Sequence, residues 1–144
     1  MSEAPAYDPN NVFAKILRGE LPAYKIYEDD RTLAFLDIMP RCPGHALVIP
    51  KSAARNILDI DPEDLAQVAR VSKKVAIAAK ATFKADGVVV MQFSEAASGQ
   101  EVFHLHVHVI PRHVGVPMKP PASDMEKPET LAGHAALLRA ALGQ

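Results

Sequence analysis

The sequence predicts one α+β domain, in which about five antiparallel strands form a sheet covered by one long helix and accompanied by one or two short helices. The chain has 144 residues, 49% of them hydrophobic, which suffices for a single core. Residues 62–84 carry a helical apolar stripe, and residues 104–111 alternate histidine with aliphatic residues as a half-buried strand does. Short turns between neighbouring strands favour antiparallel pairing.

The N-terminal region predicts an irregular lead-in followed by a short helix. Residues 1–10 contain two prolines and small polar residues, so we expect them to be flexible. Asn11 is a suitable N-cap for a helix over residues 12–18, and Gly19 is a suitable stop. This helix is about two turns long.

Three strands are predicted next. Residues 25–28 and 32–38 flank an acidic turn, which is typical of a hairpin. Residues 46–49 form an unbroken apolar run suited to a central strand, and Pro50 ends it. His45 stands at the entry to this strand.

The long helix has a clear start. Asp61 is a good N-cap, Pro62 fits the first helical position, and Glu63 and Asp64 complement the positive end of the helix dipole. One face is apolar and is expected to pack on the sheet. It consists of Leu65, Val68, Ala69, Val71, Val75, Ala76, Ala79 and Phe83.

The C-terminal half predicts a second hairpin. Residues 88–93 read as a strand, and the small-residue loop 94–101 leads into the histidine segment. Residues 114–128 are proline-rich and irregular, whereas residues 129–142 have a helical pattern.

Composition excludes several classes of protein. The net charge is −1 and the charges are mixed, so we expect no binding to nucleic acid or to anionic membranes. Cys42 is the single cysteine, which precludes an internal disulfide and a cysteine-rich zinc site. With no signal peptide and no long apolar segment, a cytoplasmic location is expected.

The histidine row is the strongest functional signal. On a strand, the aliphatic residues enter the core while His104, His106 and His108 share the other face, roughly 7 Å apart. Histidines at this spacing suit zinc or iron if His45, His113 or Glu101 supplies a third ligand. This metal hypothesis lacks a carboxylate or cysteine at ligand spacing.

Covalent catalysis at phosphorus is the favoured interpretation. The loop that ends in Gly99-Gln100 has small residues whose backbone N–H groups suit phosphoryl oxygens. A neutral imidazole can attack through Nε2 while an acceptor holds Nδ1–H. The middle histidine, His106, is best placed for this role, and its neighbours can orient phosphate oxygens and donate a proton.

These residues resemble the histidine triad (HIT) family. Its signature of three histidines separated by apolar residues is matched by His104–Ile110, and residues 12–51 and 99–112 resemble the two conserved parts of the family. The resemblance implies a HIT domain over residues 11–113, with residues 114–144 as a proline-rich tail and C-terminal helix. It also implies a HIT-like fold and a homodimer whose sheet continues across the two-fold axis.

The resemblance further implies nucleotidyl transfer through a covalent nucleotidyl-histidine, followed by attack of water, with no cofactor and no metal. His106 matches the nucleophile, and His104 and His45 match residues that orient it and relay protons. The backbone carbonyl of His104 is expected to fix the tautomer of His106, and His108 matches the phosphate contact. The implied nucleotide-binding residues are Phe13, Ile16, Leu21, Phe35, Asp37 and Ile38, with Asp37 accepting the ribose hydroxyls, and Ser94, Gly99 and Gln100 at the phosphate.

The resemblance leaves two classes of substrate open. Ser94 lies where many members have asparagine, and Glu101 replaces a serine that assists the leaving group in nucleoside phosphoramidases. The N-terminal half resembles Hint-type phosphoramidases, whereas Gly99-Gln100 and the Pro-Arg pair ending at Arg112 also resemble diadenosine polyphosphate hydrolases. We favour a purine nucleotide substrate of the AMP phosphoramidate type. A non-catalytic nucleotide-binding regulator and a metal-binding protein are the alternatives of other classes.

Overall fold

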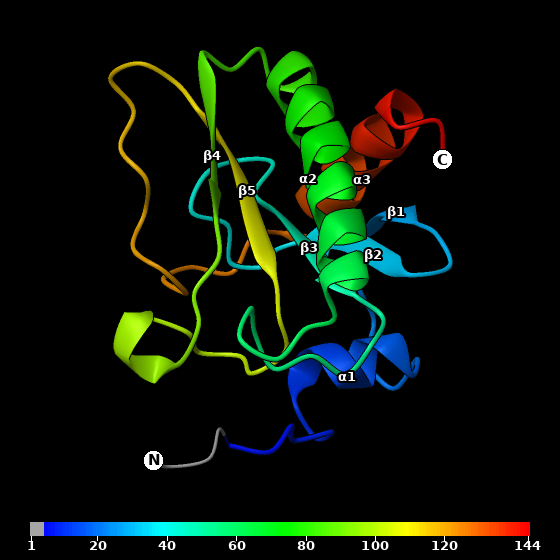
Figure 1. The fold of residues 1–144 in the computed structure, drawn as a ribbon. Coiled ribbons are helices and arrows are strands. Elements are labelled where there is room, and N and C mark those ends of the chain that lie inside the picture. Colours follow the sequence, from blue (N-terminus) through cyan, green and yellow to red (C-terminus); the bar gives the residue numbers. More distant parts are fainter. Residues whose placement is uncertain (1–4) are drawn as a thin grey trace.

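The computed structural model describes residues 5–144 and contains one five-stranded antiparallel sheet with three helices (Figure 1). The spatial order of the strands is β1-β2-β3-β5-β4, which confirms the predicted α+β class. Residues 1–4 of the expected lead-in lie outside the described part. The strands are β1 (Lys25–Glu28), β2 (Thr32–Leu36), β3 (Ala46–Pro50), β4 (Gly87–Met91) and β5 (Val107–Arg112); the helices are α1 (Val12–Leu17), α2 (Pro62–Thr82), α3 (Pro128–Ala141) and the short 3-10 helix η1 (Ala96–Ser98).

The helix starts follow the predicted capping chemistry. The Asn11 side chain accepts a hydrogen bond from the Ala14 N–H at 2.9 Å, and the Asp61 carboxylate accepts one from the Glu63 N–H at 2.8 Å. Helix α2 ends at Thr82, two residues before the predicted end, where the chain turns through a positive φ at Lys84. No helix within residues 5–144 combines the length and the apolar character needed to cross a membrane.

Strand β5 is shorter than the sequence pattern predicts. Its pairing with β3 begins at Val107, and the N–H of Leu105 is instead bonded to the carbonyl of Ala54 at 2.8 Å. The prediction that this strand begins at His104 is therefore wrong, although Leu105 enters the same core as Val107 and Val109, as predicted. His104 precedes the strand, and its side chain is fully buried.

The sheet is covered on both faces, which explains why β2 and β3 are buried along their whole length. Figure 1 shows α2 lying across one face, with α3 beside it. On that face, Val68, Val71 and Val75 of α2 join the same core cluster as Val107 and Val109 of β5. A smaller cluster on the face carrying α1 consists of Phe13, Leu33, Phe35, Leu47 and Ile49.

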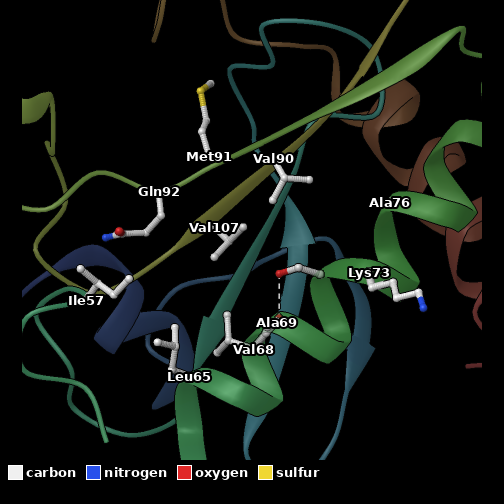
Figure 2. A pocket seen from close by; sticks show the side chains of 11 residues that line it. Ile57, Leu65, Val68, Ala69, Lys73, Ala76, Val90, Met91, Gln92 and Val107 are labelled. Atoms are coloured by element: carbon white, nitrogen blue, oxygen red, sulfur yellow. Dashed lines mark hydrogen bonds between the residues drawn. The ribbon is translucent and has the colours of Figure 1, made fainter. Parts of the chain in front are cut away.

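A groove of about 460 Å³ lies between α2 and β4 (Figure 2). Apolar side chains of both elements face one another across it, and its serine, Ser72, donates its hydroxyl to the Val68 carbonyl at 2.7 Å. Lys73 is the charged residue in its lining. Strand β4 is an edge of the sheet, and Val90 on it is 52% exposed.

The proline-rich tail is irregular, as predicted, but it is fastened to the domain. The N–H of Lys119 donates to the Arg41 carbonyl at 2.9 Å, and the Arg41 Nε–H donates to the Lys119 carbonyl at 2.7 Å. The Glu126 N–H donates to the Ile38 carbonyl at 2.9 Å. The tail therefore runs along residues 38–41, the loop between β2 and β3.

Candidate active site

A cavity of about 670 Å³ lies on the face of the sheet that carries α1. Its volume is within the range of small-molecule sites. All six residues predicted to hold the nucleoside line it, and so do three of the four predicted catalytic histidines. The lining includes Phe13, Ile16, Leu21, Phe35, Asp37, Ile38, His45, Gly99, His106 and His108, together with Val12, Met39, Arg41, Met91, Phe93, Glu101, Val102, Pro121 and Ala122.

One ring nitrogen of His106, Nδ1, is hydrogen-bonded to the backbone. Its Nδ1–H donates to the carbonyl of His104 at 2.7 Å, so Nε2 carries the lone pair. The Phe13 ring packs edge-to-face on the imidazole, with centroids 4.9 Å apart. Burial lowers the pKa of His106 below its usual value of 6.5, which favours the neutral ring at pH 7. This imidazole is ready to act as a nucleophile.

A hydrogen-bonded chain fixes the other two cavity histidines. The backbone N–H of Arg41 donates to His45 Nδ1 at 3.1 Å, so the neutral His45 ring carries its proton on Nε2. That Nε2–H donates to His108 Nδ1 at 2.9 Å, which leaves the His108 proton on Nε2. The centroids of the His106 and His108 rings are 4.9 Å apart. An N–H donor therefore lies beside the nucleophile.

Burial keeps these two imidazoles neutral. With burial as the largest cause, the pKa of His45 is lowered to about 3 and that of His108 to about 4. Neighbouring imidazoles and the positive charge of Arg41 contribute to both of these shifts. The cavity thus contains three neutral imidazoles at pH 7, and their tautomers follow from their backbone and ring partners.

A tight turn positions His45. Its N–H bonds to the Cys42 carbonyl at 3.1 Å, and Gly44 between them has φ of +87°. A Cβ at Gly44 would collide with the ring of Phe83, so glycine is needed here for both its backbone conformation and its size. The turn aims the imidazole back towards β5.

His104 supports the site from behind and does not line the cavity. Its Nε2–H donates to the Pro50 carbonyl at 2.8 Å, and its Nδ1 accepts a hydrogen bond from the Tyr7 hydroxyl at 2.6 Å. Burial lowers the pKa of His104 to about 4. Tyr7 lies in the predicted lead-in, and nothing in the sequence identified it as part of the site.

Asp37 presents a carboxylate to the same cavity directly after β2. One oxygen accepts the Met39 N–H at 2.8 Å, and the other is 3.7 Å from His45 Nε2. Burial raises the pKa of Asp37, so additional hydrogen-bond donors would stabilise its ionised form. A ribose diol supplies such donors.

Donor atoms of Asp37, His45 and His108 lie within 4.8 Å of one another, which makes them the candidate metal ligands among the described residues. The two imidazole nitrogens of this group are already hydrogen-bonded to each other. A cation would have to replace that bond and the proton in it. The donor set therefore fits a hydrogen-bonded relay better than a metal centre.

Ser94 and Gln100 do not line the cavity, although Gly99 does. The Gln100 side-chain oxygen accepts from Asn56 and from the Glu95 N–H, and its amide donates to the Arg55 and Val102 carbonyls. Its hydrogen-bonding capacity is used within the protein. The Ser94 hydroxyl is likewise bonded to Gln92 and to the Ile57 N–H. Both residues support the loop.

An ion pair that the sequence did not indicate holds the same loop. Glu95 has a positive φ of +75°, unusual for a residue with a side chain, and Arg55 contacts its carboxylate through two bonds of 2.9 Å. Asn56 donates to the same carboxylate at 2.6 Å. The Arg55 guanidinium and this amide lower the pKa of Glu95 to about 2. These contacts fix the backbone that brings Phe93 and Gly99 to the cavity.

Comparison with known proteins agrees with this geometry. The HIT domain model matches residues 18–115. A Hit-like protein from Bartonella henselae, reported as involved in cell-cycle regulation, is 51% identical with a TM-score of 0.91 over 95% of this chain and 99% of its own. A hypothetical histidine triad nucleotide-binding protein from Sulfolobus tokodaii is 34% identical, with a TM-score of 0.83 over 91% of both chains. A zinc-bound histidine triad family protein from Mycobacterium smegmatis is 40% identical, with a TM-score of 0.81 over 94% of both chains.

The match covers the site as well as the sheet. Residues 18–115 include every strand, the three histidines of the motif and His45. The tail beyond residue 115 and all of α1 lie outside the matched range, although both contribute to the cavity wall. Shared sequence, fold and histidine arrangement lead to one conclusion: this chain belongs to the HIT family of nucleotide-binding proteins and nucleotide hydrolases.

Proposed function

We propose that this protein hydrolyses AMP conjugates of the adenosine phosphoramidate type by attack of His106 on the α-phosphate. The observation that carries the proposal is the tautomer of His106, whose Nδ1–H is bonded to the His104 carbonyl while Nε2 is free. His108, with its proton on Nε2, lies next to it. A nucleophile and an N–H donor are thus adjacent in one cavity.

The reaction proceeds in two displacements. The lone pair on His106 Nε2 forms a bond to phosphorus as the P–N bond to the leaving amine breaks, and the amine takes up a proton. Water then attacks the nucleotidyl-histidine, the P–Nε2 bond breaks, and AMP is released with the loss of one water proton. The His108 N–H stabilises negative charge on a phosphoryl oxygen in both transition states, because it is fixed before the substrate binds.

Asp37 and the apolar wall would bind the nucleoside. Phe13, Ile16 and Phe35 offer flat and aliphatic surface for a purine, and Asp37 offers an acceptor for the ribose hydroxyls. Diadenosine polyphosphates are the second candidate substrates, since the Arg41 guanidinium at the cavity would favour additional phosphates.

The test is hydrolysis of an adenosine phosphoramidate and a diadenosine polyphosphate side by side in EDTA, with trapping of an acid-labile nucleotidyl-enzyme. We expect cleavage of the phosphoramidate at the higher rate and an adduct on His106. Faster cleavage of the polyphosphate would assign the other branch. Activity that returns only with added metal would support the metal hypothesis, and AMP binding without cleavage of either compound would support a non-catalytic regulator.

We also propose that two copies pair through β4 and the adjoining groove. Strand β4 is an open edge with unpaired backbone groups, and the exposed side chains of Val90 and Ile77 lie on the two elements that border the groove. Light scattering should give twice the monomer mass of 15.6 kDa. Val90→Lys should shift the protein towards the monomer, and an unchanged dimer would place the interface elsewhere.

A further inference from the structure

We propose that Arg41 selects substrates whose leaving group carries an anionic oxygen group, either a carboxylate or a phosphate. The inference rests on the proposed function and specifies which conjugates of AMP the cavity favours. It rests on the position of Arg41, on its missing acidic partner and on the way in which the tail holds it.

Arg41 lies at the end of the histidine chain. Its backbone N–H bonds to His45, which in turn bonds to His108, and its side chain lines the same cavity. The guanidinium is close enough to contribute to the lowered pKa of both imidazoles, after burial as the main cause. A positive charge is therefore held near the reacting phosphate.

The guanidinium has no carboxylate partner within residues 5–144 at ion-pair distance. Ion pairs found in this part of the chain use Arg18, Arg31 and Arg55, whereas the bond recorded for the Arg41 guanidinium goes to the carbonyl of Lys119 at 2.7 Å. A neutral acceptor leaves its full charge uncompensated. Two terminal nitrogens remain to form a fork with an anionic group.

The tail gives Arg41 a fixed position. Lys119 and Arg41 exchange two hydrogen bonds, so the side chain and the main chain of the arginine are tied to the same tail residue. Two residues further on, Pro121 and Ala122 enter the cavity wall, and Ala122 has a positive φ of +51°. The Arg41 side chain is then ordered on folding, so a ligand that binds to it loses less affinity to side-chain ordering.

The leaving group is the part of the substrate that remains to contact the charge of Arg41. Adenosine has no anionic group, and the α-phosphate is assigned to the N–H of His108 and to His106. An amine or phosphate leaving group with its own anion would extend the negative charge of the substrate towards Arg41. Glu101, on the loop that precedes β5, is a further charged residue of the lining, and it opposes anions rather than binding them.

The experiment compares two conjugates that share the P–N bond: AMP joined to the nitrogen of glycine, which has a carboxylate, and AMP joined to glycinamide, which has none. We expect Arg41→Met to lower the ratio of kcat/KM for the acid over the amide by about tenfold, the effect of one partly solvated charge-assisted hydrogen bond. Arg41→Lys should lower it less, because the charge stays but the fork is lost.

Lys119→Ala is the matched control. It removes a positive charge from the same surface but keeps the backbone carbonyl that holds Arg41, so the ratio should not change. A diadenosine tetraphosphate measured in the same series distinguishes the two sources of anion. A larger loss with this compound than with the glycine conjugate would identify phosphate as the preferred group.

Three outcomes separate the two proposals. An unchanged ratio in Arg41→Met would overturn the role of Arg41, either because neither rate changes or because both fall equally; the second case would mean that Arg41 binds the shared α-phosphate. If the wild type cleaves neither conjugate, the proposed function fails. Calorimetric affinities of the two conjugates for His106→Ala, with and without Arg41→Met, still test Arg41 in that case.

Discussion

At the start of β5, three successive residues alternate between two different faces of the sheet. Val107 lines the groove against α2, whereas His106 and His108 on either side of it line the cavity. Both hollows are of small-molecule size, about 460 Å³ and 670 Å³. In the groove the hydroxyl of Ser72 is already bonded, but in the cavity His106 Nε2, His108 Nε2 and the Arg41 fork remain available. Unused hydrogen-bonding capacity therefore marks the site better than size does.

The contrast between the cavity and the groove is tested most strongly by His106→Ala. We expect turnover to fall at least about 10³-fold, because no other cavity group presents an unprotonated Nε2 with its Nδ1–H held by a backbone carbonyl. AMP binding should change little, since the residues proposed to hold the nucleoside remain. Activity within tenfold of the wild type would place the nucleophile elsewhere.

Lowering the pH from 7 to 5 should act mainly on the buried histidines. His45, His104 and His108 have folded-state pKa values of about 3, 4 and 4, against 6.5 for the free side chain, so the unfolded chain binds protons first. Their contribution is complete above pH 6.5 and is lost as the pH falls towards 4. The free energy of unfolding should fall by up to about 1.4 kcal/mol per pH unit for each histidine.

Urea unfolding at pH 7, 6 and 5 measures this slope. His104→Asn should reduce it by the share of one histidine. Equal stability at pH 7 and pH 5 would contradict the neutral buried imidazoles on which the proposed mechanism depends.

Val107→Ala tests the groove face. Removing two buried methyl groups from the core should cost about 2 kcal/mol of unfolding free energy. The kcat/KM of the folded protein should stay within about twofold, because the Val107 side chain points away from the flanking histidines. A large loss of activity at unchanged stability would show that the two faces are coupled.

Tyr7→Phe tests whether a residue outside the cavity lining supports the site. The variant keeps the ring but removes the donor to His104 Nδ1, which should cost about 1 kcal/mol and lower kcat a few-fold by loosening the support of His106. Tyr24→Phe is the control, because Tyr24 packs on the core and no hydroxyl bond is recorded for it in the described structure. Equal behaviour of the two variants would remove Tyr7 from the site.

Ser72→Ala should have the smallest effect. The hydroxyl bonds to a carbonyl of its own helix, and its loss should change stability by less than about 0.5 kcal/mol with no effect on activity. Chemical denaturation and a kinetic assay measure both quantities. A substantial loss of activity would mean that the groove binds something polar.

Local signals in the sequence predicted most of the fold. Asn11 and Asp61 as caps, Pro62 at a helix start and the apolar runs of β2 and β3 each depend on a few neighbouring residues. The shorter length of β5 was not predictable in this way. The residues before Val107 do not pair with the sheet, and the Leu105 N–H bonds instead to the carbonyl of Ala54, which lies 51 positions earlier in the chain.

The same distinction between sequence patterns and long-range contacts applies to the site. The histidine motif and the six nucleoside residues were predictable because they follow a family pattern, and all of the latter line the cavity. Tyr7, Arg55 and Lys119 follow no pattern, since each acts by contact with a residue distant in sequence. Ser94 and Gln100 were predicted at the phosphate, but their side chains are used in holding their own loop.

The fastening of the tail to Arg41 also bears on how the protein is made. During synthesis the histidine motif emerges before Lys119 and Pro121, so a nascent chain presents the catalytic imidazoles while one wall of the cavity is still missing. Domains complete their long-range contacts only when the distant segments have been translated. A ribosome-bound chain that stops at residue 115 therefore carries every histidine of the motif but lacks the anchor of Arg41, and discrimination among leaving groups becomes a property of the finished polypeptide.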